Sequence, residues 1–128
     1  MVTLHSVRVL VLNDDPHRLA LLAAPLRARG ASVLAAPSVR DALVGFVTAH
    51  PAVVVSDLCT PVSGGMSLIR EVRALARLSG TTTRALGITT ATRAADRDEA
   101  LRAGFDDLLV APVDPDDLCA KIAALIAH

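Results

Sequence analysis

Aromatic side chains are nearly absent from this sequence of 128 residues. Phe46 and Phe105 are the only two, and the chain contains no tryptophan or tyrosine. Proteins that bind single-stranded nucleic acid stack the bases on aromatic side chains. The 13 basic residues are also balanced by 13 acidic ones, so the sequence shows no excess of positive charge. Both features argue against direct binding of nucleic acid.

Cysteines and long apolar segments are also scarce. Cys59 and Cys119 form neither a CxxC pair nor a zinc-binding spacing, which argues against a disulfide scaffold and a zinc site. The longest stretch without Asp, Glu, Lys or Arg, Ala42–Ser56, has 15 residues and is too short to span a bilayer. The N-terminus lacks the basic and small-residue features of a signal peptide. We expect one domain over residues 1–128, in the reducing cytoplasm and without membrane contact.

Short apolar runs alternate with amphipathic helical patterns along the whole chain. Hydrophobic residues make up 52% of the sequence, which is enough for a packed core and excludes a disordered chain. Strands are predicted at residues 7–12, 32–36, 52–56, 84–89 and 107–111. Helices are predicted between them and after the last, and the third and fourth cover about 66–78 and 93–103. The alternation predicts an α/β fold, a doubly wound five-stranded parallel sheet with helices on both faces.

Capping residues mark where several of these helices begin and end. Residues that favour the first cap or the first turn are Asp15-Pro16, Ser38 and Asp114-Pro115, and glycines that favour a stop are Gly30 and Gly104. Pro25 lies inside the first helix and should kink its last turn. In the second helix, Val39, Leu43, Phe46 and Val47 are predicted to face the core.

Polar side chains follow the predicted strands where each strand ends. Asn13 and Asp14 follow the first strand, Asp57 follows the third, and Thr89 and Thr90 close the fourth. In open α/β sheets the active crevice lies at the carboxyl ends of the strands. Asp14 and Asp57 are therefore expected to meet there and to hold Mg2+. A carboxylate beside Mg2+ can act as a nucleophile towards phosphorus, and the Thr89 hydroxyl can hydrogen-bond a phosphoryl oxygen.

Each of these residues also has a simpler interpretation as an ordinary loop, cap or strand-end residue. Their coincidence at one edge of the sheet favours a functional site. Four segments then resemble the receiver domain of two-component response regulators, the CheY-like fold, over essentially the full chain: VLVLNDDP, VVVSDLCTPVSGG, LGITT and AGFDDLLVAPVDPDDL. The resemblance implies strand order 2-1-3-4-5 and a phosphoryl group received from a histidine kinase or phosphotransfer protein.

The resemblance also assigns roles to individual residues. It implies that Asp57 is the phosphoacceptor and that Thr89 is the hydroxyl of the conformational switch. It implies a Mg2+ cofactor held by Asp14, Asp57 and the backbone carbonyl of Cys59. The first acid of the family's motif falls on Asn13, which carries no charge but can hydrogen-bond a metal-bound water. The fourth helix, fifth strand and fifth helix would form the output surface for a downstream protein or domain.

Two further positions depart from the family's pattern. The lysine that precedes the proline after the fifth strand falls on Ala111, and the aromatic switch residue falls on Leu108. The missing lysine removes a cation that would pair with the phosphoryl group, a charged hydrogen bond that contributes roughly 1.5–3 kcal/mol. The only lysine, Lys121, is predicted to be a solvated residue of the last helix. Arg93 follows the fourth strand and is a candidate to reach the pocket.

The other polar residues fit surface roles. The four histidines share no ligand spacing. The pairs Asp106-Asp107 and Asp116-Asp117 are expected to solvate helix ends and loops. The charges between Arg93 and Arg102 fit a solvated helix face with charge pairs.

Three other functions compete with a phosphorylated receiver. A degenerate receiver would keep Asp57 but act through protein contacts without phosphorylation, and the residues at positions 13, 108 and 111 favour it. An aspartyl phosphohydrolase would need a second aspartate where Cys59 stands, and a flavin protein would need a hydroxyl-rich loop after the first strand. We therefore expect a phosphoacceptor rather than a turnover enzyme, either as a stand-alone receiver or as part of a longer regulator.

Overall fold

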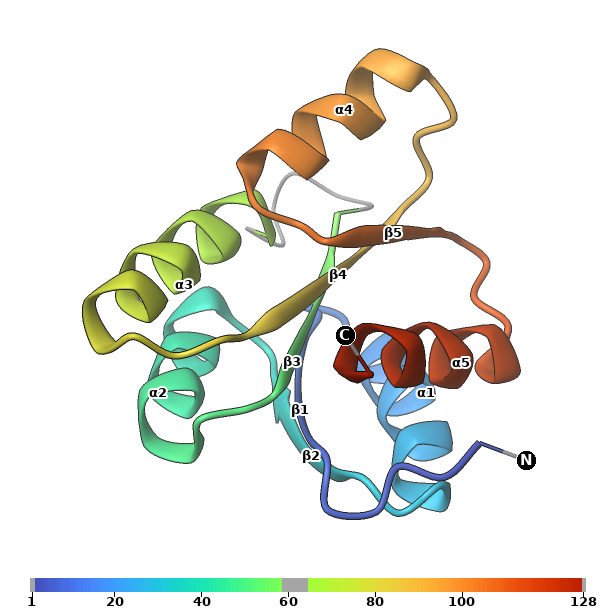
Figure 1. Cartoon of the computed structure of the whole chain (residues 1–128). Coiled ribbons are helices and arrows are strands. Elements are labelled where there is room, and N and C mark those ends of the chain that lie inside the picture. Colours follow the sequence, from blue (N-terminus) through green and yellow to red (C-terminus); the bar gives the residue numbers. More distant parts are fainter. Residues whose placement is uncertain (1, 59–64, 128) are drawn as a thin grey trace.

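Five strands form one parallel sheet in the order β2-β1-β3-β4-β5, which confirms the predicted fold and strand order (Figure 1). The computed structural model describes residues 2–58 and 65–127, and these bounds apply to the elements that follow. The strands are β1 (Arg8–Leu12), β2 (Ser32–Ala36), β3 (Val53–Asp57), β4 (Arg84–Thr89) and β5 (Asp107–Val110). The helices are α1 (Pro16–Ala28), α2 (Val39–Ala49), α3 (Gly65–Ser79), α4 (Ala94–Ala103) and α5 (Pro115–Ile126).

The predicted strands agree with the structure to within one residue at each end. Asp57, which the sequence places where the third strand ends, is the last residue of β3, so this strand is shifted by one residue from the predicted range. Asp57 is in register with Ile88 of β4, and the amide of Leu58 donates to the Ile88 carbonyl at 2.7 Å. The backbone pairing of β3 with β4 therefore includes Asp57. A prediction from apolar residues alone would end the strand before this polar residue.

The predicted helix caps are present. The Asp15 carboxylate accepts hydrogen bonds from the amides of His17 and Arg18, and the carboxylate of Asp114 caps α5 in the same way. The Ser38 hydroxyl accepts from the Asp41 amide at the start of α2. These side chains satisfy amide groups that have no partner inside the helix.

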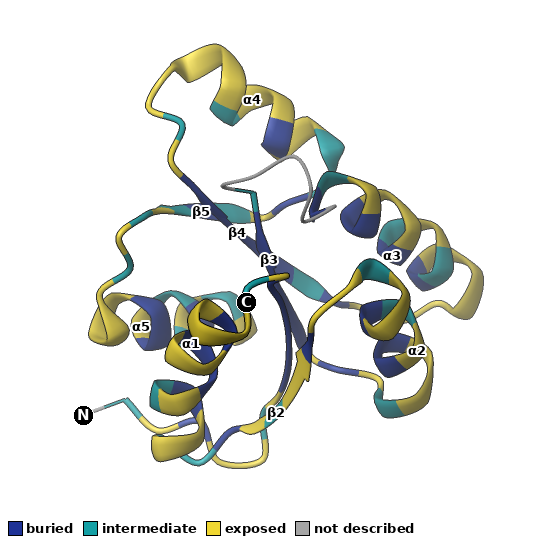
Figure 2. Cartoon of the chain, turned by 180° about the vertical axis from the view of Figure 1, so that it is seen from behind, coloured by how far each residue is buried: buried dark blue, intermediate teal, exposed yellow. Residues whose placement is uncertain are grey.

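Alternation along the strands divides the core into two layers. Side chains at positions 9, 11, 53 and 55 pack under α1 and α5, whereas those at 10, 12 and 54 pack under α2 and α3. Figure 2 shows the buried central strands between helices whose outer faces are exposed. Because side chains alternate between faces, Asn13 and Asp57 continue the series on the α1 and α5 side. No helix among the described residues is long and apolar enough to cross a bilayer.

The predicted inward face of α2 is wrong at one position. Val47 is half exposed, and the buried residues of this helix are Ala42, Gly45 and Phe46. The helix covers the edge of the sheet formed by β1 and β2 and also contacts α3. Its contact strip is therefore narrower than the apolar stripe of its sequence.

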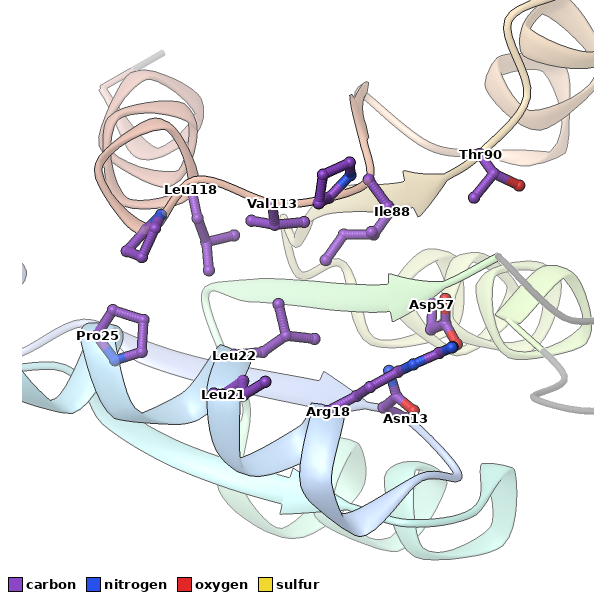
Figure 3. A pocket seen from close by; sticks show the side chains of 13 residues that line it. Asn13, Arg18, Leu21, Leu22, Pro25, Asp57, Ile88, Thr90, Val113 and Leu118 are labelled. Carbon is purple, nitrogen blue, oxygen red and sulfur yellow. The ribbon is translucent and has the colours of Figure 1, made fainter.

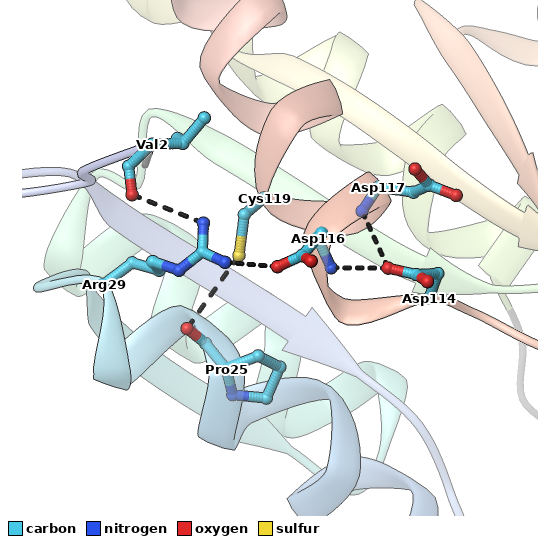
Figure 4. A network of polar contacts seen from close by, with 7 residues as sticks. All are labelled: Val2, Pro25, Arg29, Asp114, Asp116, Asp117 and Cys119. Atoms are coloured by element: carbon cyan, nitrogen blue, oxygen red, sulfur yellow. Dashed lines mark hydrogen bonds and ion pairs between the residues drawn. The ribbon is translucent and has the colours of Figure 1, made fainter.

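The C-terminal end of α1 is tied to the start of α5 (Figure 4). The guanidinium of Arg29 donates to the carbonyl of Val2 at 3.3 Å and forms an ion pair with Asp116. The thiol of Cys119 is buried and lies 3.8 Å from the carbonyl oxygen of Pro25. Cys119 belongs to the core, and its burial raises the pKa of the thiol.

Asp106 and Asp107 do not simply solvate a loop, and Lys121 is not simply solvated. The Asp106 carboxylate accepts from the buried Ala85 amide at 2.7 Å and from Arg73 at 2.8 Å. Lys121 donates to Asp107 at 2.8 Å. Partial burial opposes ionisation of Asp107, but its hydrogen bonds from Lys121 and a backbone amide hold its pKa below the usual value. The pattern of the sequence could not show these partners because they lie on other elements.

Candidate functional site

A pocket of about 470 Å³ opens at the carboxyl ends of the strands, between α1 and the start of α5 (Figure 3). Asn13, Arg18, Asp57 and Thr90 form its polar part. The rest of the lining is apolar and consists of Leu21, Leu22, Pro25, Ile88, Ala111, Pro112, Val113, Pro115 and Leu118. The pocket therefore joins an apolar groove to the strand ends that the sequence marks as a functional site.

Asp57 lies at the strand-end side of this pocket, near Asn13 and across from Pro25 (Figure 3). Its exposed fraction is 1%, and its backbone is in register with Ile88 of β4, one residue beyond the last pair of β3 with β1 at Ser56. Positive charge and hydrogen-bond donors are the groups that compensate a buried carboxylate for lost water. Asp57 is therefore suited to bind a cation, or to react with a group that carries a bound cation.

Of the two residues expected at the end of β1, the structure brings one into the pocket. Asn13 is 3% exposed and lies beside Asp57 (Figure 3), where its amide oxygen accepts from the Asp15 backbone amide at 2.9 Å. Asp14 follows it with an exposed side chain outside the pocket lining. The expected pair of strand-end carboxylates thus consists of one buried and one exposed group.

The donor atoms at these strand ends fit a hard cation. Carboxylate and amide oxygens are the ligands that Mg2+ prefers, and Mg2+ keeps several waters when few protein ligands are present. Within residues 2–58 and 65–127 there is no cluster of three His, Cys, Asp or Glu side chains that would form a closed metal cage. Cys59, whose carbonyl is the third predicted ligand, lies outside the described residues. The donors therefore suit a weakly held, largely hydrated Mg2+.

The two threonines at the end of β4 differ in their surroundings. Thr89 is 6% exposed, and its hydroxyl oxygen accepts from the Ala91 amide at 2.9 Å. A hydroxyl can accept and donate at once, so its hydrogen is still available to a phosphoryl oxygen. Thr90 is exposed and lines the pocket, whereas Thr89 does not. The predicted switch hydroxyl thus lies next to the pocket rather than on its surface.

The end of β5 brings no positive charge to the pocket. Ala111 lines it where the resemblance places a lysine, and Lys121 is engaged with Asp107. Leu108 is 4% exposed and packs over Gly87, where an added Cβ would lie 2.8 Å from its Cδ2 atom. The position of the aromatic switch residue is therefore filled by a buried aliphatic side chain.

The positively charged side chain in the pocket comes from α1, and not from the residue after β4 that was the candidate. Arg93 is exposed and is not part of the lining, but Arg18 of α1 is. In Figure 3 the Arg18 side chain runs along the pocket towards Asp57, beside Asn13. Its position in the sequence offers one signal: Arg18 lies in the first turn of α1, three residues after the Asp15 cap. Because side chains in a helix tilt towards its N-terminus, a residue there points towards the strand ends.

A five-stranded parallel sheet in this order, with a buried aspartate closing β3 beside oxygen donors from β1, defines a receiver-type site. The sequence profile of the response regulator receiver domain matches residues 9–123. The chain belongs to this family, the receiver domains of two-component response regulators.

Individual proteins agree with this assignment. An uncharacterised 14.6 kDa protein of Leptolyngbya boryana is 41% identical over 92% of this chain and 88% of its own length. The transcriptional regulatory protein PrrA of Mycobacterium tuberculosis is 33% identical over 94% of this chain and 50% of its own length. The chain thus spans about half the length of this regulator. The structure of the chemotaxis protein CheY4 of Vibrio cholerae has 26% identity and a TM-score of 0.83, covering 93% of this chain and 98% of that one.

Proposed function

We propose that this receiver accepts a phosphoryl group on Asp57 from a phosphohistidine of a histidine kinase or phosphotransfer protein. The observation that carries the proposal is the buried carboxylate that lines an open pocket at the carboxyl ends of the strands. The exposed apolar residues beside it, such as Leu21 and Pro115, offer a surface on which the donor protein would dock. Signalling from phosphate derived from ATP would place the reaction in the cytoplasm.

The proposed reaction is a transfer between two covalent carriers. A carboxylate oxygen of Asp57 attacks the phosphorus of the phosphohistidine, the P–N bond breaks, and the imidazole leaves and takes up a proton. Asp14, Asp57 and the carbonyl of Cys59 would hold Mg2+, which supplies positive charge to the phosphoryl oxygens. Asn13 would orient a metal-bound water, and the Thr89 hydroxyl would donate to a phosphoryl oxygen. The chain would act as an acceptor, not as a turnover enzyme, and would signal through the face of α4, β5 and α5.

The direct test is incubation with a small-molecule phosphodonor and Mg2+, followed by intact mass. We expect the chain to gain one phosphoryl group and Asp57→Asn to gain none, because an amide is a much poorer nucleophile than a carboxylate. Asp96→Asn, an exposed aspartate of α4, is the matched control and should be modified like the native chain. A gain that persists in Asp57→Asn would contradict the assignment. No gain from any small donor or kinase would favour a receiver that works without phosphorylation.

Ala111→Lys should strengthen the binding of beryllofluoride, a phosphoryl mimic, in the presence of Mg2+. Ala111 lines the pocket on the side of β5, so an ammonium there would face the mimic on Asp57. A charged hydrogen bond of about 1.5 kcal/mol corresponds to roughly tenfold in affinity, which calorimetric titration can measure.

Val110→Lys adds the same charge one residue away, at a position outside the pocket lining, and should leave the affinity unchanged. The gain from Ala111→Lys should disappear when Asp57→Asn is added. Equal effects of the two lysines would show that general charge, and not the pocket, is responsible.

A further inference from the structure

We propose that Arg18 of α1 provides the positive charge that pairs with the phosphoryl group on Asp57. It would take the place of the lysine that the family carries after β5, where this chain has Ala111. This inference rests on the proposed function, since it concerns the same pocket. Figure 3 shows the Arg18 side chain extending from α1 along the pocket towards Asp57, with Asn13 beside its end. Among the described residues that line the pocket, Arg18 is the only one with a positively charged side chain.

The position of Arg18 is fixed by the start of α1. Its backbone amide donates to the Asp15 cap, and its Nε atom lies 3.8 Å from the Asp15 Oδ2 atom. Its side chain is 54% exposed, so the guanidinium can adjust to a group that arrives in the pocket. The guanidinium therefore makes a loose, solvent-exposed ion pair with Asp15, from which it can turn towards a ligand in the pocket.

The charges of the pocket are consistent with this role. Asn13 is neutral, so the strand ends carry one negative charge fewer than a pair of acids would, and Ala111 contributes no cation. A guanidinium presents a planar set of donors that matches phosphoryl oxygens, which an ammonium does not. Arg18 would thus balance Asp57 before phosphorylation and pair with the phosphoryl group afterwards.

This role has a signature that a purely structural role lacks. A guanidinium near Asp57 repels Mg2+ in the absence of an anion but attracts a bound phosphoryl mimic. Removing it should therefore change the two affinities in opposite directions. A residue that only supported the fold would weaken both affinities when removed.

The experiment compares Arg18→Ala, Arg18→Lys and the native chain by calorimetric titration, first with Mg2+ alone and then with beryllofluoride at saturating Mg2+. The chain has no tryptophan for a fluorescence assay. For Arg18→Ala we expect beryllofluoride affinity to fall about tenfold, the effect of one charged hydrogen bond on a half-exposed group. Its affinity for Mg2+ should rise by a few fold. Arg18→Lys should lie between, and Arg93→Ala, an exposed arginine outside the lining, should match the native chain.

The outcomes of these titrations distinguish the role of Arg18 from the proposed function. Unchanged affinities in Arg18→Ala, or tighter binding of beryllofluoride, would overturn the inference, the latter by showing that Arg18 obstructs the pocket. If the native chain binds Mg2+ but no beryllofluoride, the proposed function fails, and the Mg2+ titrations alone then decide the role of Arg18. Absence of both kinds of binding in every variant would overturn both proposals. Thermal unfolding of each variant confirms that it is folded.

Discussion

Gly65→Ala should destabilise the protein and damage the pocket together. Gly65 is the first residue of α3 and is buried. A Cβ atom there would lie 2.5 Å from the backbone oxygen of Asp57 and 2.6 Å from the Cδ2 atom of Leu58. The Leu58 side chain can rotate, but the carbonyl of Asp57 can move only with the end of β3. Forcing an extra carbon into a packed site typically costs about 1–3 kcal/mol, measurable by urea unfolding. Beryllofluoride affinity should fall as well, because Asp57 itself is displaced.

Gly45→Ala provides the comparison for this prediction. Gly45 is a buried glycine inside α2, and the nearest atom to an added Cβ, the Cδ1 of Leu10, lies at an ordinary 3.4 Å. Alanine is favoured over glycine within a helix by up to about 1 kcal/mol, so this variant should be as stable as the native chain or slightly more stable. Equal destabilisation by both substitutions would mean that the contact with Asp57 is not what requires a glycine at position 65.

Local chemistry explains why most of the fold was predictable. The caps at Asp15, Ser38 and Asp114 act on amides two or three residues away, and each is present in the structure. Strand patterns are similarly local, and the order of the strands followed from the alternation of elements and the family resemblance. The placement of Asp57 in a pocket at the strand ends followed in turn, because that position depends on topology rather than on side-chain contacts.

The composition of the pocket was less predictable. Arg18 of α1 lines the pocket, and so does Thr90, whereas Thr89 does not. Both facts depend on the directions of side chains, which a periodic sequence pattern does not reveal. The candidate cation Arg93 is exposed at the cap that precedes α4 and does not line the pocket. Predicting Arg18 requires knowing that α1 and the end of β3 line the same pocket, which depends on the tertiary structure. The missing lysine at Ala111 was visible in the sequence, but the side chain that faces Asp57 in its absence was not.

Asp106→Ala should destabilise the protein by about 2–3 kcal/mol in urea unfolding, far more than Asp107→Ala. The Arg73 guanidinium donates to the carbonyls of Thr83 and Gly104 and to the carboxylate of Asp106. It thereby links α3 to the residues just before β4 and just after α4. The Asp106 carboxylate also accepts from the amide of the fully buried Ala85. Its removal leaves that donor without its acceptor, which costs about 1–3 kcal/mol, and takes a counter-charge from Arg73.

The neighbouring carboxylate is the natural control, because the sequence alone gives both aspartates the same role. Asp107 pairs with Lys121 where both side chains are more than a third exposed, and such pairs contribute about 0–1 kcal/mol. Asp106→Asn should also be milder than Asp106→Ala, since its amide oxygen can still accept from the buried amide of Ala85. Equal losses in Asp106→Ala and Asp107→Ala would show that the ion pairs matter more than the buried backbone donor. The larger loss that we expect for Asp106→Ala than for Asp107→Ala assigns the main effect to the hydrogen bond that Asp106 accepts from the Ala85 amide, near the start of β4.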